Sequence, residues 1–278
     1  MKIPQITVLM SVYNGEKFVK SAIESVLNQT FKDFEFLIIN DGSSDTSLEI
    51  IEKYKAQDQR IILINRENKG LITSLNEGIS LSSGAYIARM DADDISIPER
   101  LSEQFNYLQK NPDVDLVGSN IIFFTDNIVK GTSNLEINKI KNLNFYRNTL
   151  GLPHPTWMGR ANFFKNFGYD QRAISVEDQD LLLRAYNSSE FVTLEKPLVF
   201  YRIYKKINYK YKLKQLGFLF LSRLRNILSL RLFHYFPIIL IIFIVSFVFC
   251  IFGIKNYNMK TNLNSKYQAI FNKITKIL

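Results

Sequence analysis

Short apolar runs alternate with longer amphipathic stretches through the first half of the chain. Each run ends in a polar turn, whereas the stretches between runs place apolar residues three or four positions apart. The runs predict buried strands and the stretches predict helices. Strand–helix–strand units of this spacing predict an α/β fold with a mainly parallel sheet flanked by helices. Strands are predicted at 6–12, 34–40, 61–64, 86–90 and 114–124, and helices around 18–27, 46–54, 71–79 and 98–110.

Polar side chains are concentrated where these predicted strands end. The strand ends carry Tyr13, Asp41, a loop at 66–70 and an acidic cluster at 91–94. In sheets of this kind, ligands bind outside the carboxyl ends of the strands. Donors and carboxylates at four neighbouring strand ends favour one shared site over four unrelated turns.

The acidic cluster is the most informative of these strand ends. Asp91, Asp93 and Asp94 follow an apolar strand, so three carboxylates repel one another and lose hydration when they are partly enclosed. A divalent cation offsets that cost, and oxygen ligands suit Mg²⁺ or Mn²⁺ better than zinc. Such a cation completes its shell with water and substrate phosphate, which predicts a metal-bridged diphosphate site. The alternative is an Asp-rich turn that caps the helix beginning near Pro98.

The sequence lacks the common glycine-rich phosphate loops. It contains neither G-x-G-x-x-G nor G-x-x-x-x-G-K-[ST]. The sequence therefore supports neither a dinucleotide-binding fold nor a P-loop nucleoside triphosphatase (NTPase). This absence favours phosphates that are held through a metal.

A second acidic cluster lies near residue 180. Glu177 and Asp178 begin a predicted helix, where the helix dipole favours negative charge, and Asp180 and Arg184 have the i,i+4 spacing of an ion pair. These effects form a non-catalytic explanation. The functional alternative is a general base, because transfer of a group to a hydroxyl requires removal of the hydroxyl proton.

The sequence between the two clusters is less regular. A turn is predicted at 127–134 and a helix at 138–145. The two prolines of 152–157 exclude a continuous helix there. Such a loop can present His154 and Trp157 to a cleft. The alternative is that His154 is hydrogen-bonded within the loop and has no binding role.

Charge divides the chain into two parts. Residues 201–278 contain 14 of the 35 Lys and Arg residues and none of the 26 Asp and Glu residues, so a basic tail follows an acidic first part. We expect one domain over residues 1–204 and a membrane-associating tail over 205–278.

The lone Cys250 excludes a disulfide framework and a cysteine metal site. No signal-peptide pattern opens the chain, which predicts that the first domain stays in the cytoplasm.

The tail contains an uncharged apolar run at 237–254. A helix of this length spans about 27 Å, close to the hydrocarbon thickness of about 30 Å, and is a candidate transmembrane helix. A buried core helix and an in-plane hairpin are the alternatives. Apolar stripes at 213–228 and 267–277 lie beside Lys and Arg, as in helices that rest on an anionic leaflet. Nucleic acid attracts such bases too, but the continuous Leu, Ile and Phe residues favour lipid.

About the first 200 residues resemble the family 2 glycosyltransferases. That family has the GT-A nucleotide-diphospho-sugar transferase fold, which is a Rossmann-like sheet flanked by helices. Each motif is modest alone, but their order and spacing together are specific. The matching motifs are Val8–Asn14, Ser25–Thr30, Asn40–Asp45, Asn68–Gly70 and Met90–Asp94.

The resemblance implies roles on the donor side of the site. Asp41 is expected to hydrogen-bond the nucleotide base, although an Asx-turn also explains an aspartate in Asp-Gly-Ser-Ser. Asp93 is expected to bind the metal, together with Asp91. The expected donor-binding residues are Tyr13, Glu16, Asp41, Lys69 and Asp91.

The resemblance also implies roles on the acceptor side. The stretch from Glu177 to Leu181 matches the family pattern Glu-Asp-x-Asp-Leu. By that match Asp178 is the base, and Glu177, His154 and Trp157 assist acceptor or phosphate binding. The implied reaction is a single displacement that inverts the sugar anomer.

Together, the resemblance and the tail predict a metal-dependent transferase. It is expected to move a sugar from a nucleotide-diphospho-sugar, such as a UDP-sugar, to a hydroxyl of a lipid-linked glycan. The expected location is the cytoplasmic face of the bacterial plasma membrane, and the expected process is surface polysaccharide assembly, such as O-antigen or capsule synthesis. Two alternatives remain, a metal-dependent nucleotide-sugar phosphohydrolase and a non-catalytic, membrane-tethered nucleotide-sugar binder.

Overall fold

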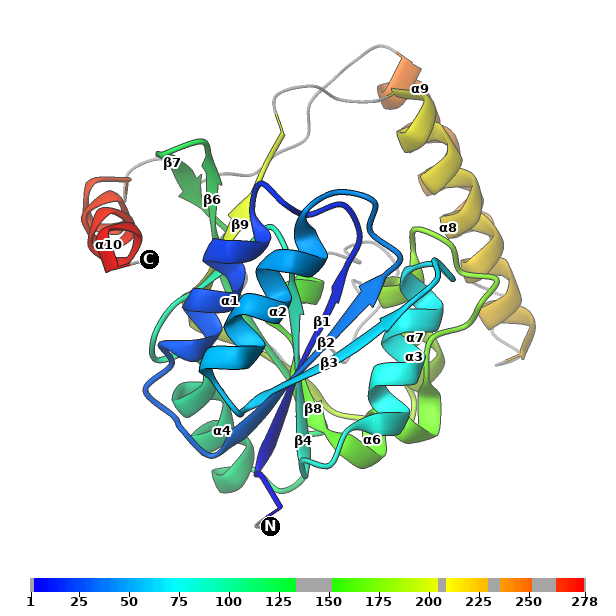
Figure 1. The fold of residues 1–278 in the computed structure, drawn as a ribbon. Helices are drawn as coiled ribbons and strands as arrows, with labels where there is room; N and C mark the ends of the chain where they lie inside the picture. The colour runs from blue at the N-terminus through cyan, green and yellow to red at the C-terminus, as the bar shows by residue number, and fades with distance from the viewer. Residues whose placement is uncertain (1–2, 134–151, 205–208, 230–235, 252–263, 278) are drawn as a thin grey trace.

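The computed structural model describes residues 3–133, 152–204, 209–229, 236–251 and 264–277. In the first part of the chain, strands and helices alternate as the apolar pattern predicts (Figure 1). The predicted helix at 138–145 lies outside the described residues. The elements are β1 (Ile6–Val12), α1 (Val19–Leu27), β2 (Phe34–Asp41), α2 (Ser47–Gln57), β3 (Ile61–Arg66), α3 (Leu71–Leu81) and β4 (Tyr86–Asp91).

The second part of the domain extends the same sheet with shorter and less regular elements. The described residues form one nine-stranded sheet in the order β3-β2-β1-β4-β8-β6-β9-β5, with β7 paired to β6. The elements are β5 (Ile95–Ser96), α4 (Arg100–Lys110), β6 (Leu116–Thr125), β7 (Ile128–Thr132), the 3₁₀ turn η1 (His154–Thr156), β8 (Met158–Arg160), α6 (Ala161–Phe167), α7 (Glu177–Ala185) and β9 (Phe191–Arg202).

The sheet is mixed, which corrects the expectation of a mainly parallel one. The first four strands are parallel to one another, as the strand–helix alternation requires. Beyond β4, the strand β8 is antiparallel to both of its neighbours, β4 and β6. β6 and β9 are parallel. β5 pairs antiparallel with β9, and β7 pairs antiparallel with β6. The α/β fold class is therefore right, but the parallel pattern does not hold beyond β4.

The two faces of the sheet bury separate cores, because successive side chains of a strand point to opposite faces. Val8 packs on one face with residues of α1, α2 and α4. Leu9 packs on the other face with residues of α3, α6 and α7. These covering helices leave the carboxyl ends of the parallel strands at one edge, where the site lies.

The predicted turn at 127–134 is instead a hairpin. β7 pairs with β6, and Thr125 lies opposite Ile128. The turn is therefore the two residues Asp126 and Asn127, and Asp126 has a φ of 52°. Aspartate and asparagine tolerate this left-handed conformation better than most residues, which suits a two-residue hairpin.

In the described part of the chain beyond residue 204, three helices follow the domain: α8 (Tyr209–Ser229), α9 (Phe236–Ile251) and α10 (Asn264–Ile277). α8 packs against α7 and α9, whereas α10 packs against β7 on the other side of the molecule (Figure 1). Phe271 and Ile274 of α10 are buried beside Phe124 and Phe200. From Tyr267 to Ile274, the stripe predicted to face lipid therefore faces protein.

The expected transmembrane helix at 237–254 is not supported. α9 has 16 residues, which at 1.5 Å each span about 24 Å, less than the hydrocarbon thickness of about 30 Å. Within the described ranges, no helix combines the length and the apolar character needed to cross a membrane. Residues 252–254 lie outside the described part of the chain.

Candidate active site

Three carboxylates meet at the carboxyl end of β4. Asp91, Asp93 and Asp94 each place a carboxylate oxygen within 4.8 Å of the other two. Asp91 ends the strand and Asp94 is buried beneath the turn that leads to β5. The strand end thus gathers the acidic cluster that the sequence predicts, and it adds Asp94 to the predicted pair.

The end of β9 holds this acidic turn in place. The Tyr204 hydroxyl donates to Asp93 Oδ2 at 2.6 Å. The backbone N–H of Arg202 donates to Asp94 Oδ1 at 2.8 Å, and Arg202 Nε donates to the Asp93 carbonyl at 2.8 Å. The Arg202 guanidinium lies 4.0 Å from the ring centre of Phe18. The sequence pattern does not indicate Arg202 or Tyr204, because they are more than 100 residues away from the cluster.

The electrostatics of the cluster fit a cation. Burial and the charge of Asp91 raise the pKa of Asp93. Burial and the charges of Asp91 and Asp93 raise the pKa of Asp94 well above its ordinary value. Asp94 Oδ2 is buried and has no hydrogen-bond partner among the described residues. An all-oxygen donor set with one unsatisfied buried oxygen fits Mg²⁺ or Mn²⁺.

Arg89 connects this cluster to the second one. Its guanidinium pairs with the Asp91 carboxylate, and its side chain is almost fully buried. Burial acts to lower the pKa of Arg89, but the charge of Asp91 acts in the opposite direction, and the pKa is raised. The charge of Arg89 also acts on the pKa of Glu177 and Asp178. The same positive charge therefore acts on both clusters. In the sequence, the only feature that could have pointed to Arg89 is its position as a charged residue within an apolar strand.

Glu177 and Asp178 form the first turn of α7, as predicted. Burial and the charge of Asp178 raise the pKa of Glu177 to about 7. Burial also raises the pKa of Asp178, which is half-buried. A carboxylate with a raised pKa is a stronger base than a solvated one, which suits proton removal from a hydroxyl.

Asp41 organises the loop before α3. Its Oδ1 accepts from the Lys69 N–H at 2.8 Å, and its Oδ2 accepts from the Gly70 N–H at 2.9 Å. Arg66 pairs with the same carboxylate. Gly70 has a φ of 86°, a conformation that favours glycine. A carboxylate accepts about four hydrogen bonds, so these three contacts leave capacity for one further donor.

The loop after β1 is tied to the loop after β2. Asn14 Oδ1 accepts from the Ser44 N–H at 2.8 Å, and Glu16 Oε2 accepts from the Thr46 hydroxyl at 3.0 Å. Tyr13 stands beside them with 57% of its surface exposed. Lys69 is exposed as well. Two neighbouring strand ends therefore form one fixed rim with an exposed aromatic ring.

The loop at 152–157 is more buried than predicted. The Trp157 ring is fully buried, and its Nε1 donates to the Leu152 carbonyl at 2.9 Å. This corrects the expectation that Trp157 is presented to a cleft. His154 Nε2 lies 2.8 Å from the Tyr169 hydroxyl, and burial and the charge of Arg89 hold the pKa of His154 well below its ordinary value. His154 is therefore a neutral, hydrogen-bonded side chain.

A GT-A-like sheet with an acidic turn after β4 and a second acidic cluster on α7 defines a class of sugar-transferring enzymes. Within that class, the chain belongs to glycosyl transferase family 2, whose family model matches residues 7–168. The family assignment agrees with the resemblance carried by the sequence motifs.

Similar proteins support the same assignment. An uncharacterized glycosyltransferase of Methanocaldococcus jannaschii is 37% identical over 220 residues, which cover 76% of this chain and 75% of that protein. An O-antigen biosynthesis glycosyltransferase of Escherichia coli, WbnJ, is 34% identical over 212 residues, which cover 74% of this chain and 82% of that protein. The chain is therefore a glycosyltransferase with relatives in polysaccharide synthesis.

Solved structures share the fold at low sequence identity. Staphylococcus aureus TarS 1–349 in complex with UDP-GlcNAc has a TM-score of 0.62 and 19% identity, over 78% of this chain and 66% of that chain. The mannosyltransferase PcManGT from Pyrobaculum calidifontis, in complex with GDP-Man and Mn²⁺, has a TM-score of 0.63 and 12% identity, over 99% of this chain and 87% of that chain.

Proposed function

We propose that this glycosyltransferase moves a sugar from a nucleotide-diphospho-sugar to a hydroxyl of a membrane-associated glycan, with inversion of the anomer. The observation that carries the proposal is the acidic cluster at the end of β4, where carboxylate oxygens of Asp91, Asp93 and Asp94 lie within 4.8 Å of one another, together with a second acidic cluster in the first turn of α7. One cluster suits a metal-held diphosphate, and the other suits a base.

The donor binds at the ends of β1, β2 and β4 in this proposal. Tyr13 stacks against the nucleoside, and Asp41 uses its remaining acceptor capacity for the base. Glu16 and Lys69 line the same rim. TarS and PcManGT are named with UDP-GlcNAc and GDP-Man, which supports a nucleotide-sugar donor, and a UDP-sugar is our first choice.

Asp93 and Asp91 hold Mg²⁺ or Mn²⁺, with Asp94 as a further carboxylate. When bound, the cation balances the charge that builds on the departing diphosphate. Arg89 keeps the Asp91 carboxylate in position through their ion pair. The Tyr204 hydroxyl fixes the Asp93 carboxylate through the hydrogen bond that it donates.

Asp178 takes the proton from the acceptor hydroxyl. The acceptor oxygen then forms a bond to the anomeric carbon while the bond from that carbon to the diphosphate oxygen breaks. The electron pair of the broken bond leaves with the nucleoside diphosphate. No enzyme nucleophile takes part, so the anomer inverts. Glu177 and His154 assist acceptor or phosphate binding, since each keeps a small exposed fraction, whereas Trp157 is fully buried and is left out.

The acceptor is proposed to be lipid-linked, because the C-terminal part has the composition of a membrane-associating segment. Residues 201–278 contain no acidic residue, and α9 exposes large apolar side chains. The proposed location is the cytoplasmic face of the plasma membrane, with α9 lying in the plane of the leaflet. The relative named for O-antigen biosynthesis supports surface polysaccharide assembly as the process. Among the described side chains of α9, the large apolar ones that are exposed are Phe236, Leu240, Ile241, Ile244 and Phe247.

The test begins with the donor and then separates the two clusters. A thermal-shift panel of UDP- and GDP-sugars with Mn²⁺ selects the donor. Asp93→Ala is then expected to abolish metal-dependent donor binding in calorimetry. Asp178→Asn is expected to keep the donor Kd within about twofold and to lower transfer by roughly 10²-fold or more, since general-base catalysis contributes about that much. Asp113→Asn, at an exposed loop position, is the matched control.

Other outcomes identify the alternatives. Equal loss of donor affinity in Asp93→Ala and Asp178→Asn contradicts the separate roles. Donor cleavage that does not depend on an acceptor indicates a phosphohydrolase. Full complementation by Asp178→Asn in cells indicates a binder without catalysis.

A further inference from the structure

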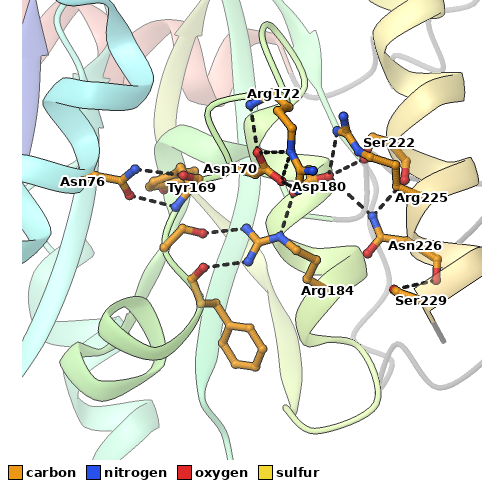
Figure 2. Close-up of polar contacts among 12 residues, drawn as sticks. Asn76, Tyr169, Asp170, Arg172, Asp180, Arg184, Ser222, Arg225, Asn226 and Ser229 are labelled. Carbon is orange, nitrogen blue, oxygen red and sulfur yellow. Dashed lines mark hydrogen bonds and ion pairs between the residues drawn. The ribbon is translucent and has the colours of Figure 1, made fainter.

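α8 lies along the helix that carries the acidic pair Glu177 and Asp178. Figure 2 shows polar side chains of α8 that point toward Asp180 of α7, which lies two residues after Asp178 in the same first turn. Ser222 and Asn226 of α8 are buried, as is Asp180. A buried carboxylate is costly unless it is hydrogen-bonded, so this contact is specific rather than incidental.

Asp180 is the centre of the contact. Its Oδ1 accepts from the Ser222 hydroxyl at 2.6 Å and from Asn226 Nδ2 at 3.4 Å, and Arg225 Nη2 lies 3.7 Å from the same oxygen. Its Oδ2 accepts from Arg184 Nε at 2.8 Å. The i,i+4 pair with Arg184 that the sequence predicts is therefore only one part of a network between two helices (Figure 2).

A second contact from α8 lies on the other side of the acidic pair. Gln215 Nε2 donates to the Ser175 carbonyl at 3.1 Å. Ser175 has a φ of 64°, an uncommon conformation for a residue other than glycine. Gln215, Ser222 and Asn226 are spaced by seven and four residues, so they share one face of α8. α8 therefore holds the chain just before Glu177 and just after Asp178.

The N-terminus of α7 has no side-chain cap of its own. Val176 occupies its N-cap and makes no side-chain capping bond. Valine cannot accept a hydrogen bond from the first turn, in contrast to the serine or aspartate usually found there. At the other end, Arg184 anchors α7 by donating to the Phe167 and Gly168 carbonyls at 2.6 Å each. Packing of Leu181, Leu182 and Leu183 holds α7 in the core, and the bonds from α8 add side-chain contacts on both sides of the acidic pair.

We propose that α8 is a clamp that positions the base: Asp180 and Ser175 bind Ser222, Asn226 and Gln215 of α8, and these bonds fix the first turn of α7. The inference rests on the proposed function for Asp178 as the base. It makes α8 part of the acceptor side of the active site, in addition to any membrane attachment. Asp180 and Ser222 are positioning residues, since they act through Asp178.

The experiment removes the clamp from the α8 side in the full-length protein. Ser222→Ala and Gln215→Ala are compared with Ser229→Ala, since the Ser229 hydroxyl donates to the Asn226 carbonyl within α8 itself. Three quantities are measured: the Kd for UDP with Mn²⁺, amide hydrogen exchange over residues 176–182, and acceptor-stimulated release of the nucleoside diphosphate from the selected donor. A panel of alkyl glycosides serves as the acceptor probe.

The clamp variants are expected to keep the Kd for UDP within twofold, to raise exchange over 176–182 at least tenfold and to lower transfer at least tenfold. Ser229→Ala is expected to match the wild type in all three. Unchanged exchange and transfer in both clamp variants overturn the proposal, and so does a parallel loss of UDP affinity. If Asp178→Asn retains transfer, the base assignment fails, and the exchange over 176–182 alone then decides whether α8 clamps α7.

Discussion

Arg89 shows how one buried charge organises the site. It sits in β4 and pairs with Asp91, while its positive charge also acts on Glu177 and Asp178. Its Nε and Nη1 are buried and have no hydrogen-bond partner in the described part of the chain. A guanidinium with so few partners is expensive to bury, so the surrounding carboxylates must compensate for it. The charge balance of the site therefore depends on a residue outside both predicted motifs.

Glu177 gives a prediction about the pH dependence of stability. Its pKa in the folded protein is about 7, above its ordinary value of 4.5, so the folded state retains a proton that the unfolded state loses. Stability must then fall as pH rises from about 4.5 to about 7. In the Glu177→Gln variant, the decrease in the free energy of unfolding over this pH range is expected to be smaller by roughly 1–3 kcal/mol, since one pKa unit corresponds to about 1.4 kcal/mol.

The measurement is the free energy of unfolding in urea from pH 5 to pH 8, with EDTA present. The difference between Glu177→Gln and wild type should move in favour of the variant as pH rises. Glu190→Gln, a change at a different carboxylate, provides the comparison. A constant difference across this range would show that Glu177 ionises normally.

At the scale of elements, the apolar pattern predicts the first half of the fold well. The strand predicted at 6–12 has the same bounds as β1, and the helix predicted from Leu71 begins where α3 begins. The pattern fails where strands are short or irregular. β8 has only three residues, and β9 contains Pro197 and pairs with β6 through register shifts near Asn120. Such strands depend on long-range pairing, which local periodicity does not report.

α10 carries the prediction at this scale. Phe271 is buried beside Phe124 and Phe200, with ring centres 5.1 Å apart in each pair. Phe271→Ala is expected to lower the free energy of unfolding by about 3 kcal/mol or more, because it removes a buried aromatic ring. Lys273→Ala, at an exposed position of the same helix, should change it by less than about 0.5 kcal/mol.

Urea unfolding measures both α10 variants, and binding to lipid vesicles is measured alongside. If α10 packs on the hairpin of β6 and β7, Phe271→Ala affects stability and leaves vesicle binding unchanged. A variant that unfolds like the wild type but loses vesicle binding would instead place this stripe against lipid.

At the scale of the whole molecule, the C-terminal helices separate into two groups. α10 packs against β7 on one side, and the α8–α9 pair lies on the other (Figure 1). α8 uses one face for α7, where Ile227 joins the core, and α9 exposes a set of large apolar residues. Only α9 and the adjoining exposed residues of α8 therefore remain as a proposed membrane-facing surface.

The membrane proposal predicts a specific loss of vesicle binding. Full-length protein should sediment with vesicles of anionic phospholipid, and high salt should weaken the association because basic residues contribute to it. Ile241→Asp combined with Ile244→Asp is expected to reduce partitioning at least tenfold, since both side chains are exposed on α9. Ile128→Asp, at an exposed apolar position on β7, is the matched control. Equal binding by the double variant and the wild type would exclude α9 as the docking surface.

The sequence by itself determined the strand–helix alternation, the family and the two acidic clusters. These features are local: apolar periodicity selects strands and helices, and a motif is a short run of residues. Only the tertiary structure decided that the buried Arg89 pairs with Asp91, that Tyr204 and Arg202 hold the acidic turn, and that α8 bonds to Asp180. It also decided that Trp157 is buried and that the stripe of α10 faces protein. The physical reason is that burial and pairing depend on residues far apart in the chain, whereas an apolar stripe looks the same in sequence whether protein or lipid covers it.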